Sequence, residues 1–133
     1  MTTAEAVKKS RKEEFASQFA KYSNDGSQFE KAIEAVLTGC VKKHTFLPSG
    51  RCIYTVVGRN ADEFIDPEKQ FCSCESYFYS VLSSKLKHCY HILSYKIANE
   101  SGLVEEVRFD DEEYDIFMSL LASDVLFSRE LRK

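Results

Sequence analysis

The sequence predicts an α+β domain, and three observations carry this prediction. Two amphipathic stretches open the chain, a run rich in β-branched and aromatic residues occupies residues 51–58, and a cluster of cysteines and histidines follows it. The length of 133 residues fits one domain, and 44% hydrophobic residues supply its core. We divide the single domain, 1–133, into N-terminal helices at 1–39, a sheet and Cys/His region at 40–100, and a C-terminal helical interaction segment at 101–133.

The first 39 residues predict a pair of helices. Apolar residues recur at helical spacing within residues 4–22, and the turn residues Asn24 to Ser27 interrupt this helix. A second helix, starting at about Ser27, carries one apolar face, made of Phe29, Ile33, Val36, Leu37 and Cys40. Gly39 lies near its end, where a left-handed backbone is often needed. Two consecutive amphipathic helices favour a helical hairpin.

Residues 41–72 predict a small three-stranded antiparallel sheet. Residues 41–47 form a strand with imperfect alternation, the turn residues 48–50 follow, and residues 51–58 form the clearest strand. Residues 59–62 turn into a short third strand at 63–65, and residues 70–72 lead on in an extended conformation.

The C-terminal half predicts helices. Apolar spacing indicates one helix over residues 76–86 and another from near His91 to Ser101-Gly102. Residues 104–109 form a short strand or a loop, and a last helix runs from Asp110 to about Phe127.

Two matched pairs of metal-ligand residues lie between residues 72 and 91. Cys72 and Cys74 are separated by one residue, and Cys89 and His91 repeat this spacing after fourteen residues. Three thiolates and an imidazole are a common tetrahedral zinc set. Residues i and i+2 share one side of an extended strand but diverge on a helix, so the second pair must stand at a helix start. With all four positions filled, the site is closed and therefore structural.

Other interpretations of these residues remain open. His88 is a rival ligand that needs a different loop path. The cysteines could be core residues beside a surface histidine, or a redox dithiol, although redox motifs usually use Cys-x-x-Cys. Cys40 and Cys52 are predicted to be core residues. The sequence shows no signal peptide and no apolar run of about 18 residues, which predicts an intracellular protein without a membrane partner.

Charge is unevenly distributed along the chain. The formal net charge of −3 argues against a strongly basic nucleic-acid binder. Residues 1–60 hold ten Lys/Arg against six Asp/Glu, whereas residues 101–133 hold four against nine. A modest basic group surrounds the predicted hairpin and could contact a phosphate backbone weakly, or could simply be a solvated strand face. Its nucleic-acid-binding members are Lys42, Lys43, Arg51 and Arg59.

The last predicted helix is unusually apolar. Nine large apolar residues lie within residues 114–127, whereas a helix that docks on its own core needs only one stripe. Some of them should therefore remain exposed and bind a partner. The predicted partner-binding residues are Tyr114, Phe117, Met118 and Leu121. The alternatives are deeper burial of the helix and a two-fold homodimer through the same surface.

The Cys-x-Cys and Cys-x-His pairs resemble those of the SWIM zinc-finger family. Over roughly residues 30–100 the chain is most similar to the small SWIM-domain subunit of Shu-type recombination complexes. The similarity is carried by the segments 49–58, 71–74, 77–82 and 89–93. The family often has lysine between the last cysteine and the histidine, where this chain has Tyr90, and this removes one cation near the site.

The resemblance implies a function that composition alone does not. It implies a bound Zn²⁺ and a non-enzymatic adaptor in homologous recombination and DNA repair. The implied partner is a RecA/Rad51-type recombinase paralogue, with which the chain would support recombinase on single-stranded DNA. In that role it would be cytoplasmic in a prokaryote and nuclear in a eukaryote. The alternatives are a free-standing SWIM zinc module that binds DNA or protein in transcription or transposition, and an enzyme with a reactive cysteine.

No catalytic constellation supports the enzyme alternative. The sequence has no Gly-rich phosphate loop and no Ser/His/Asp arrangement worth pursuing. The acidic run at residues 110–113 opens a predicted helix, where negative charge complements the helix dipole. We therefore expect that the chain is not an enzyme.

Overall fold

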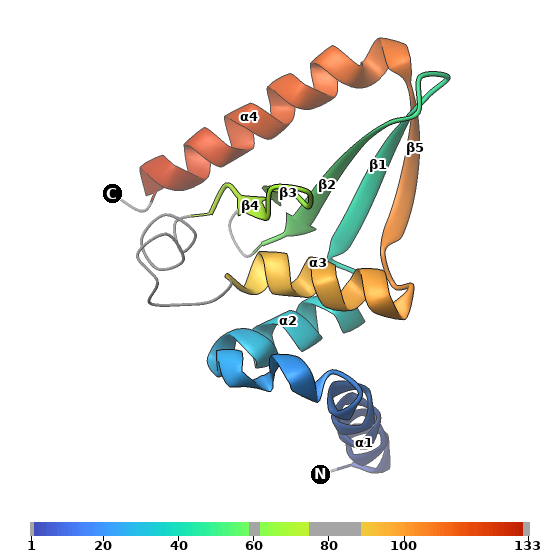
Figure 1. Ribbon diagram of the computed structural model, residues 1–133, viewed down its shortest axis with the longest axis vertical. Helices are drawn as coiled ribbons and strands as arrows, with labels where there is room; N and C mark the ends of the chain where they lie inside the picture. The colour runs from blue at the N-terminus through green and yellow to red at the C-terminus, as the bar shows by residue number, and fades with distance from the viewer. Residues whose placement is uncertain (1, 59–61, 75–88, 132–133) are drawn as a thin grey trace.

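The computed structural model describes residues 2–58, 62–74 and 89–131 and confirms the α+β class. A five-stranded mixed sheet lies between two groups of helices, with strand order β4-β3-β2-β1-β5 (Figure 1). The strands are β1 (Val41–Leu47), β2 (Arg51–Val57), β3 (Asp62–Asp66), β4 (Phe71–Cys72) and β5 (Glu105–Asp110). The α-helices are α1 (Thr3–Ser17), α2 (Ser27–Leu37), α3 (Tyr90–Ser101) and α4 (Tyr114–Leu131). Two 3-10 helices are η1 (Ala20–Asp25) and η3 (Asp111–Glu113).

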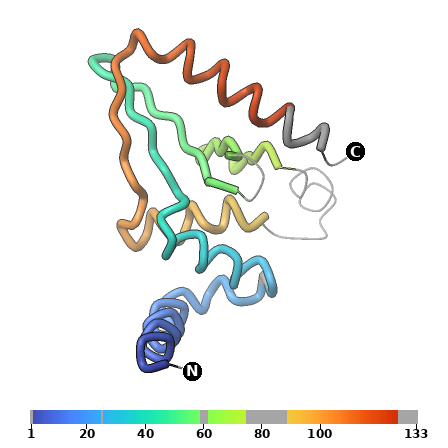
Figure 2. Tube along the Cα trace, turned by 180° about the vertical axis from the view of Figure 1, so that it is seen from behind, coloured from blue at the N-terminus to red at the C-terminus, as the bar shows by residue number. Residues whose placement is uncertain are grey.

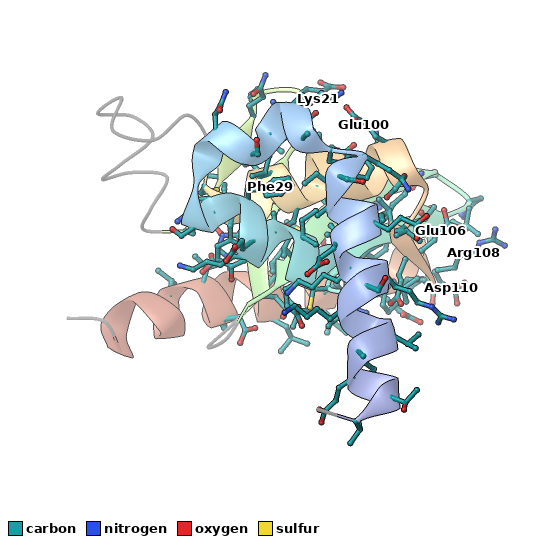
Figure 3. The ribbon with its side chains drawn as sticks, turned by 90° about the horizontal axis from the view of Figure 1, so that it is seen from below. Lys21, Phe29, Glu100, Glu106, Arg108 and Asp110 are labelled. Atoms are coloured by element: carbon teal, nitrogen blue, oxygen red, sulfur yellow. The ribbon has the colours of Figure 1, made fainter. Side chains whose placement is uncertain are left out.

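The N-terminal part differs from the predicted hairpin. The expected helix over residues 4–22 is divided into α1 and η1, and α1 begins with a capping box between Thr2 and Glu5. No residue of α1 is buried, and the helix projects from the rest of the chain (Figure 3). Helix α2 packs its apolar face mainly against α3, and not against α1 as a helical hairpin would require. Lys21 of η1 also bonds Glu100 of α3 at 3.0 Å (Figure 3).

The sheet is larger than the sequence predicts. The three predicted strands are present as β1, β2 and β3 in antiparallel order, and β4 extends them. Residues 104–109, which the sequence predicts as a strand or a loop, largely form β5, which pairs parallel with β1 from Lys42–Glu105 to Leu47–Asp110. The prediction of a three-stranded antiparallel sheet was wrong, because this pairing joins residues about sixty positions apart and no local pattern reports it.

The two faces of the sheet carry different helices. On one face, Tyr54 of β2 meets Tyr95 of α3 with ring centroids 5.1 Å apart. The core on this face joins the sheet to α2 and α3, with Ile33, Val56 and Leu93 among its buried members. The potential metal ligands Cys72, Cys74 and Cys89 belong to the same core. The metal site therefore lies between the sheet and α3.

The opposite face carries α4 over an aromatic cluster. Phe117 of α4 lies 4.6 Å from His44 and 5.4 Å from Phe46, between ring centroids. Phe109 of β5 stacks on Phe46 at 5.4 Å, and Tyr114 meets Phe46 edge-on at 5.1 Å. Helix α4 crosses the sheet on the side opposite α2 and α3 (Figure 2).

Other sequence predictions have mixed outcomes. Gly39 has φ +73°, the left-handed conformation expected at the end of α2. The predicted helix at 76–86, the turn residue Arg59 and the rival ligand His88 lie outside the described residues. Within the described ranges, none of the helices combines the length and the apolar character needed to cross a membrane.

Candidate metal centre

The first ligand pair is held by the β3–β4 hairpin. Cys72 pairs with Ile65 in the ladder, which fixes its direction toward α3. The chain enters β4 through Gln70, which has φ +51° and accepts a hydrogen bond from Lys96 Nζ of α3 at 3.1 Å. The hairpin is therefore tied to the helix that carries the second ligand pair.

The second pair stands at the start of α3, as its spacing predicts. Cys89 is the N-cap, with extended φ −75° and ψ 160°, and His91 lies in the first turn. The backbone N–H of Tyr90 donates to Gln28 Oε1 of α2 at 3.1 Å, which satisfies one of the unpaired donors of this helix end. The change from extended to helical backbone lets residues 89 and 91 face the same point.

The four predicted ligands come together as one buried cluster. The potential ligand atoms of Cys72, Cys74, Cys89 and His91 all lie within 4.8 Å of one another. Tetrahedral zinc with bonds of about 2.3 Å to sulfur separates its ligand atoms by about 3.8 Å, so small side-chain adjustments suffice. His91 Nδ1 is buried and has no hydrogen-bond partner among the described residues. A buried imidazole nitrogen without a partner is costly unless it binds an ion, so the donor set fits Zn²⁺.

The thiols of the cluster depend on one another electrostatically. The thiols of Cys72 and Cys74 lower the pKa of Cys89 to about 4, and the backbone amides of Ile92 and His91 act in the same direction. The pKa of Cys72 is raised, because its thiol donates hydrogen bonds to the sulfurs of Cys74 and Cys89 and because it is buried. The lowered pKa favours the thiolate form of Cys89, which is the form that binds metal.

Tyr90 stands beside the cluster, between the ligands Cys89 and His91. Its ring lies 3.9 Å from the His91 ring, and Lys31 Nζ of α2 sits 5.9 Å from its centroid. Burial raises the pKa of Tyr90, and the charges of Cys74 and Glu63 raise it further. The ammonium group of Lys31 on α2 thus lies over the ring of Tyr90, close to the cluster.

The two remaining cysteines lie apart from the cluster. Cys40 is half-buried, with its Sγ 3.3 Å from Thr38 Oγ1. Cys52 is exposed, so the prediction that it is a core residue was wrong. Cys52 lies near the start of β2, next to the turn that joins β1 to β2, and its side chain is left uncovered there.

The predicted nucleic-acid residues do not share one face. Register and alternation place Lys42 and Arg51 on the α4 side of the sheet and Lys43 on the α3 side. Each has an acidic neighbour: Lys42 bonds Glu105 at 2.9 Å, and Lys43 approaches Glu106 at 3.9 Å. Arg51 lies 3.7 Å from Asp111 and stacks 3.9 Å from the Tyr114 centroid. Arg59 lies outside the described residues.

The four predicted partner-binding residues are half-buried or buried. Tyr114 and Phe117 join the aromatic cluster, Met118 is half-buried, and Leu121 is buried. Among the described side chains of α4, the exposed large apolar residues are Ile116, Leu120 and Leu126, which are 66%, 67% and 63% exposed. The expectation of an exposed apolar surface on this helix is confirmed, but different residues form it.

Sequence reasoning missed two residues beside the cluster, Glu63 and Ser73. Both are buried, and Ser73 Oγ donates to Glu63 Oε2 at 2.7 Å. The only signal in the sequence is the position of Ser73 between two ligands. Glu63 lies in a strand whose alternation does not distinguish a buried carboxylate from an exposed one.

Comparisons with known proteins agree with the motif. Over 85 residues the chain is 33% identical to a protein of Dictyostelium discoideum described as a zinc finger SWIM domain-containing protein 7 homolog. The match covers 62% of this chain and 54% of the relative, so the chain spans about half the length of that protein. No protein-family model and no solved structure matches the chain. The similarity and the buried Cys₃His cluster together support a zinc-binding module.

Proposed function

We propose that the chain is a non-enzymatic zinc-binding adaptor in homologous recombination. It acts with a RecA/Rad51-type recombinase paralogue to support recombinase on single-stranded DNA. The similarity to a SWIM-domain protein and the resemblance to the Shu-type subunit support this proposal. The recombination role goes beyond the zinc module itself and rests on that resemblance.

The observation that carries the adaptor interpretation is the closed ligand set. Four buried side chains offer one ligand atom each, which is the full tetrahedral complement of Zn²⁺. A catalytic zinc needs an open position for water or substrate, and this cluster offers none. The ion would therefore hold the β3–β4 hairpin to the start of α3, and binding must come from other surfaces.

The outer face of α4 is the surface we assign to the partner. Ile116 and Leu120 lie one turn apart, and about two thirds of each side chain is exposed. Exposed apolar residues near one another commonly mark interaction sites. Acidic residues precede and flank them, among them Glu112, Glu113 and Asp115. The face therefore fits an apolar groove with basic residues at its rim.

The test is affinity capture of the tagged full chain from its native cells. We expect a recombinase paralogue in the eluate, identified by mass spectrometry, and reduced capture with Ile116→Asp and Leu120→Asp together. A matched control places the same substitutions at Val7 and Leu103, which are also exposed apolar residues but lie elsewhere. This control should capture the partner as the wild type does. A folded, zinc-loaded wild type that captures no recombinase paralogue would contradict the proposed function.

A further inference from the structure

Ser73 sits between two ligands and is tied to the neighbouring strand. Its backbone N–H donates to Phe64 O at 3.0 Å, and its Oγ accepts from the N–H of Phe64 at 2.9 Å. The same hydroxyl donates to Glu63 Oε2 at 2.7 Å. Ladder pairing ends at Cys72, so these three bonds hold the chain beyond the last strand residue.

Glu63 reaches this position from inside the sheet. It lies on β3 opposite Val56, and only 2% of its surface is exposed. Glutamate is almost never fully buried unless it is paired, because burial removes the water that solvates the carboxylate. Ser73 supplies one hydrogen bond to this buried group. This bond ties the carboxylate of β3 directly to the residue that stands between the ligands Cys72 and Cys74.

We infer that Glu63 and Ser73 are positioning residues of the metal site. Glu63 fixes the Ser73 hydroxyl, and Ser73 fixes the backbone between Cys72 and Cys74, so both sulfurs are presented toward Cys89 and His91 before the ion arrives. This inference rests on the zinc site and is independent of the recombination role. Neither residue touches the ion; both act through the conformation of the ligand loop.

The physical gain is preorganisation. Beyond β4 the ligand loop is held at Ser73, by a backbone bond to Phe64 and by the bonds of its side chain. Without these bonds, the loop would lose conformational freedom when its two thiolates bind the ion. The hydroxyl and carboxylate remove that freedom in advance. Groups outside the ligand set that orient ligands typically change metal affinity by about 10–100-fold when they are removed.

The experiment measures zinc affinity of the full chain by competition with a chromophoric chelator. Ser73→Ala should weaken zinc binding at least about tenfold. Ser73→Thr, which keeps the hydroxyl, should restore most of the affinity. Glu63→Gln should weaken binding less, and it should add little to Ser73→Ala in the double variant, because Glu63 acts through Ser73.

A second measurement separates positioning from general stability. Co²⁺ bound in place of zinc has a visible spectrum that reports ligand geometry, and Ser73→Ala should alter it. The matched control is Thr55→Val, which removes another buried hydroxyl, bonded to His44 Nε2 at 3.0 Å on the opposite face. This control should lower the melting temperature but leave the Co²⁺ spectrum unchanged.

The outcomes distinguish the inference from its premise. If the wild type binds no zinc, the metal site itself fails. If the wild type binds zinc but Ser73→Ala matches Thr55→Val in zinc affinity and Co²⁺ spectrum, the positioning role is overturned. If Ser73→Ala does not fold, the comparison of Glu63→Gln with Thr55→Val decides on the same two readouts.

Discussion

At the scale of single residues, His44 is an ionisable side chain enclosed by aromatic rings. Its ring lies 4.6 Å from that of Phe117 and 6.0 Å from that of Phe109, and Nε2 bonds Thr55 Oγ1. Burial lowers the pKa of His44, and the charge of Lys42 lowers it further. The ring nitrogen Nδ1 is buried and has no hydrogen-bond partner among the described residues. None of these residues therefore stabilises a second proton on the imidazole.

This geometry predicts a loss of stability in mild acid. The folded pKa of His44 lies below the unfolded value of about 6.5, so its contribution is complete above pH 6.5. It is lost as the pH falls below 6.5 and through the folded pKa, because only the unfolded state takes up the proton readily. We expect the free energy of unfolding to decrease between pH 7 and pH 5, measured by urea denaturation.

The variant His44→Gln isolates this effect. We expect it to be less stable than the wild type at pH 8, but its stability should fall less on acidification, since glutamine does not titrate. Acid also protonates the metal ligands in both proteins, so the difference between them at each pH removes that shared term. Equal pH dependence in the two proteins would exclude His44 as its source.

The cysteines predict a sharp contrast between positions. Cys72→Ser removes a ligand, and because structural zinc contributes directly to folding, it should abolish stoichiometric zinc and lower the melting temperature strongly. Cys52→Ser changes an exposed thiol and should have little effect. Elemental analysis and thermal melts of the two variants provide the measurement. An unaltered melt of Cys72→Ser would rule out a structural zinc.

The ligands could be predicted from sequence, whereas their supporting residues could not. The spacing of Cys72, Cys74, Cys89 and His91 reports local backbone geometry, and local geometry is what a sequence pattern encodes. Glu63 supports the site through a contact across a hairpin. Its role depends on the register between β3 and the ligand loop, which spacing does not specify.

At the scale of elements, α4 has two apolar faces with different tasks. Phe117 and Leu121 pack against the sheet, while Ile116 and Leu120 are exposed. The sequence predicted that the helix had too many apolar residues for one stripe. It could not assign them to the two faces, because that depends on where the helix sits over β1 and β3.

We therefore expect opposite results from charges placed on the two faces. Phe117→Asp with Leu121→Asp buries unpaired carboxylates and should cost several kcal/mol, enough to release α4 or unfold the chain. Ile116→Asp with Leu120→Asp should change the free energy of unfolding by less than about 0.5 kcal/mol. Circular dichroism during thermal melting compares the two. Similar losses in both variants would mean that the outer face is also buried.

At the scale of the whole molecule, charge limits any affinity for nucleic acid. The chain carries a formal net charge of −3, and Lys42, Lys43 and Arg51 each lie within 4 Å of a carboxylate. Single-stranded DNA would have to displace these partners before it gained the cations. Direct contact with DNA stays a prediction, with a weak, backbone-directed interaction expected.

Salt dependence provides the check on this expectation. Anisotropy of a labelled single-stranded oligonucleotide should show binding that falls steeply between 50 and 200 mM salt. Lys42→Glu with Arg51→Glu, on the α4 side, should reduce binding if that face is used, whereas Lys43→Glu tests the α3 side. Tight binding that survives high salt would contradict a backbone-directed interaction.

The parallel pairing of β1 with β5 has a consequence for synthesis of the protein. Strand β1 leaves the ribosome early, yet one of its two neighbours is not made until residue 110. Until then the nascent chain presents β1 as an open sheet edge, which is a template for pairing with another chain. A ribosome that pauses between residues 60 and 104 would therefore lengthen the period in which nascent chains can associate. A variant that stops at residue 104 should accumulate as aggregates, even though its metal ligands are complete.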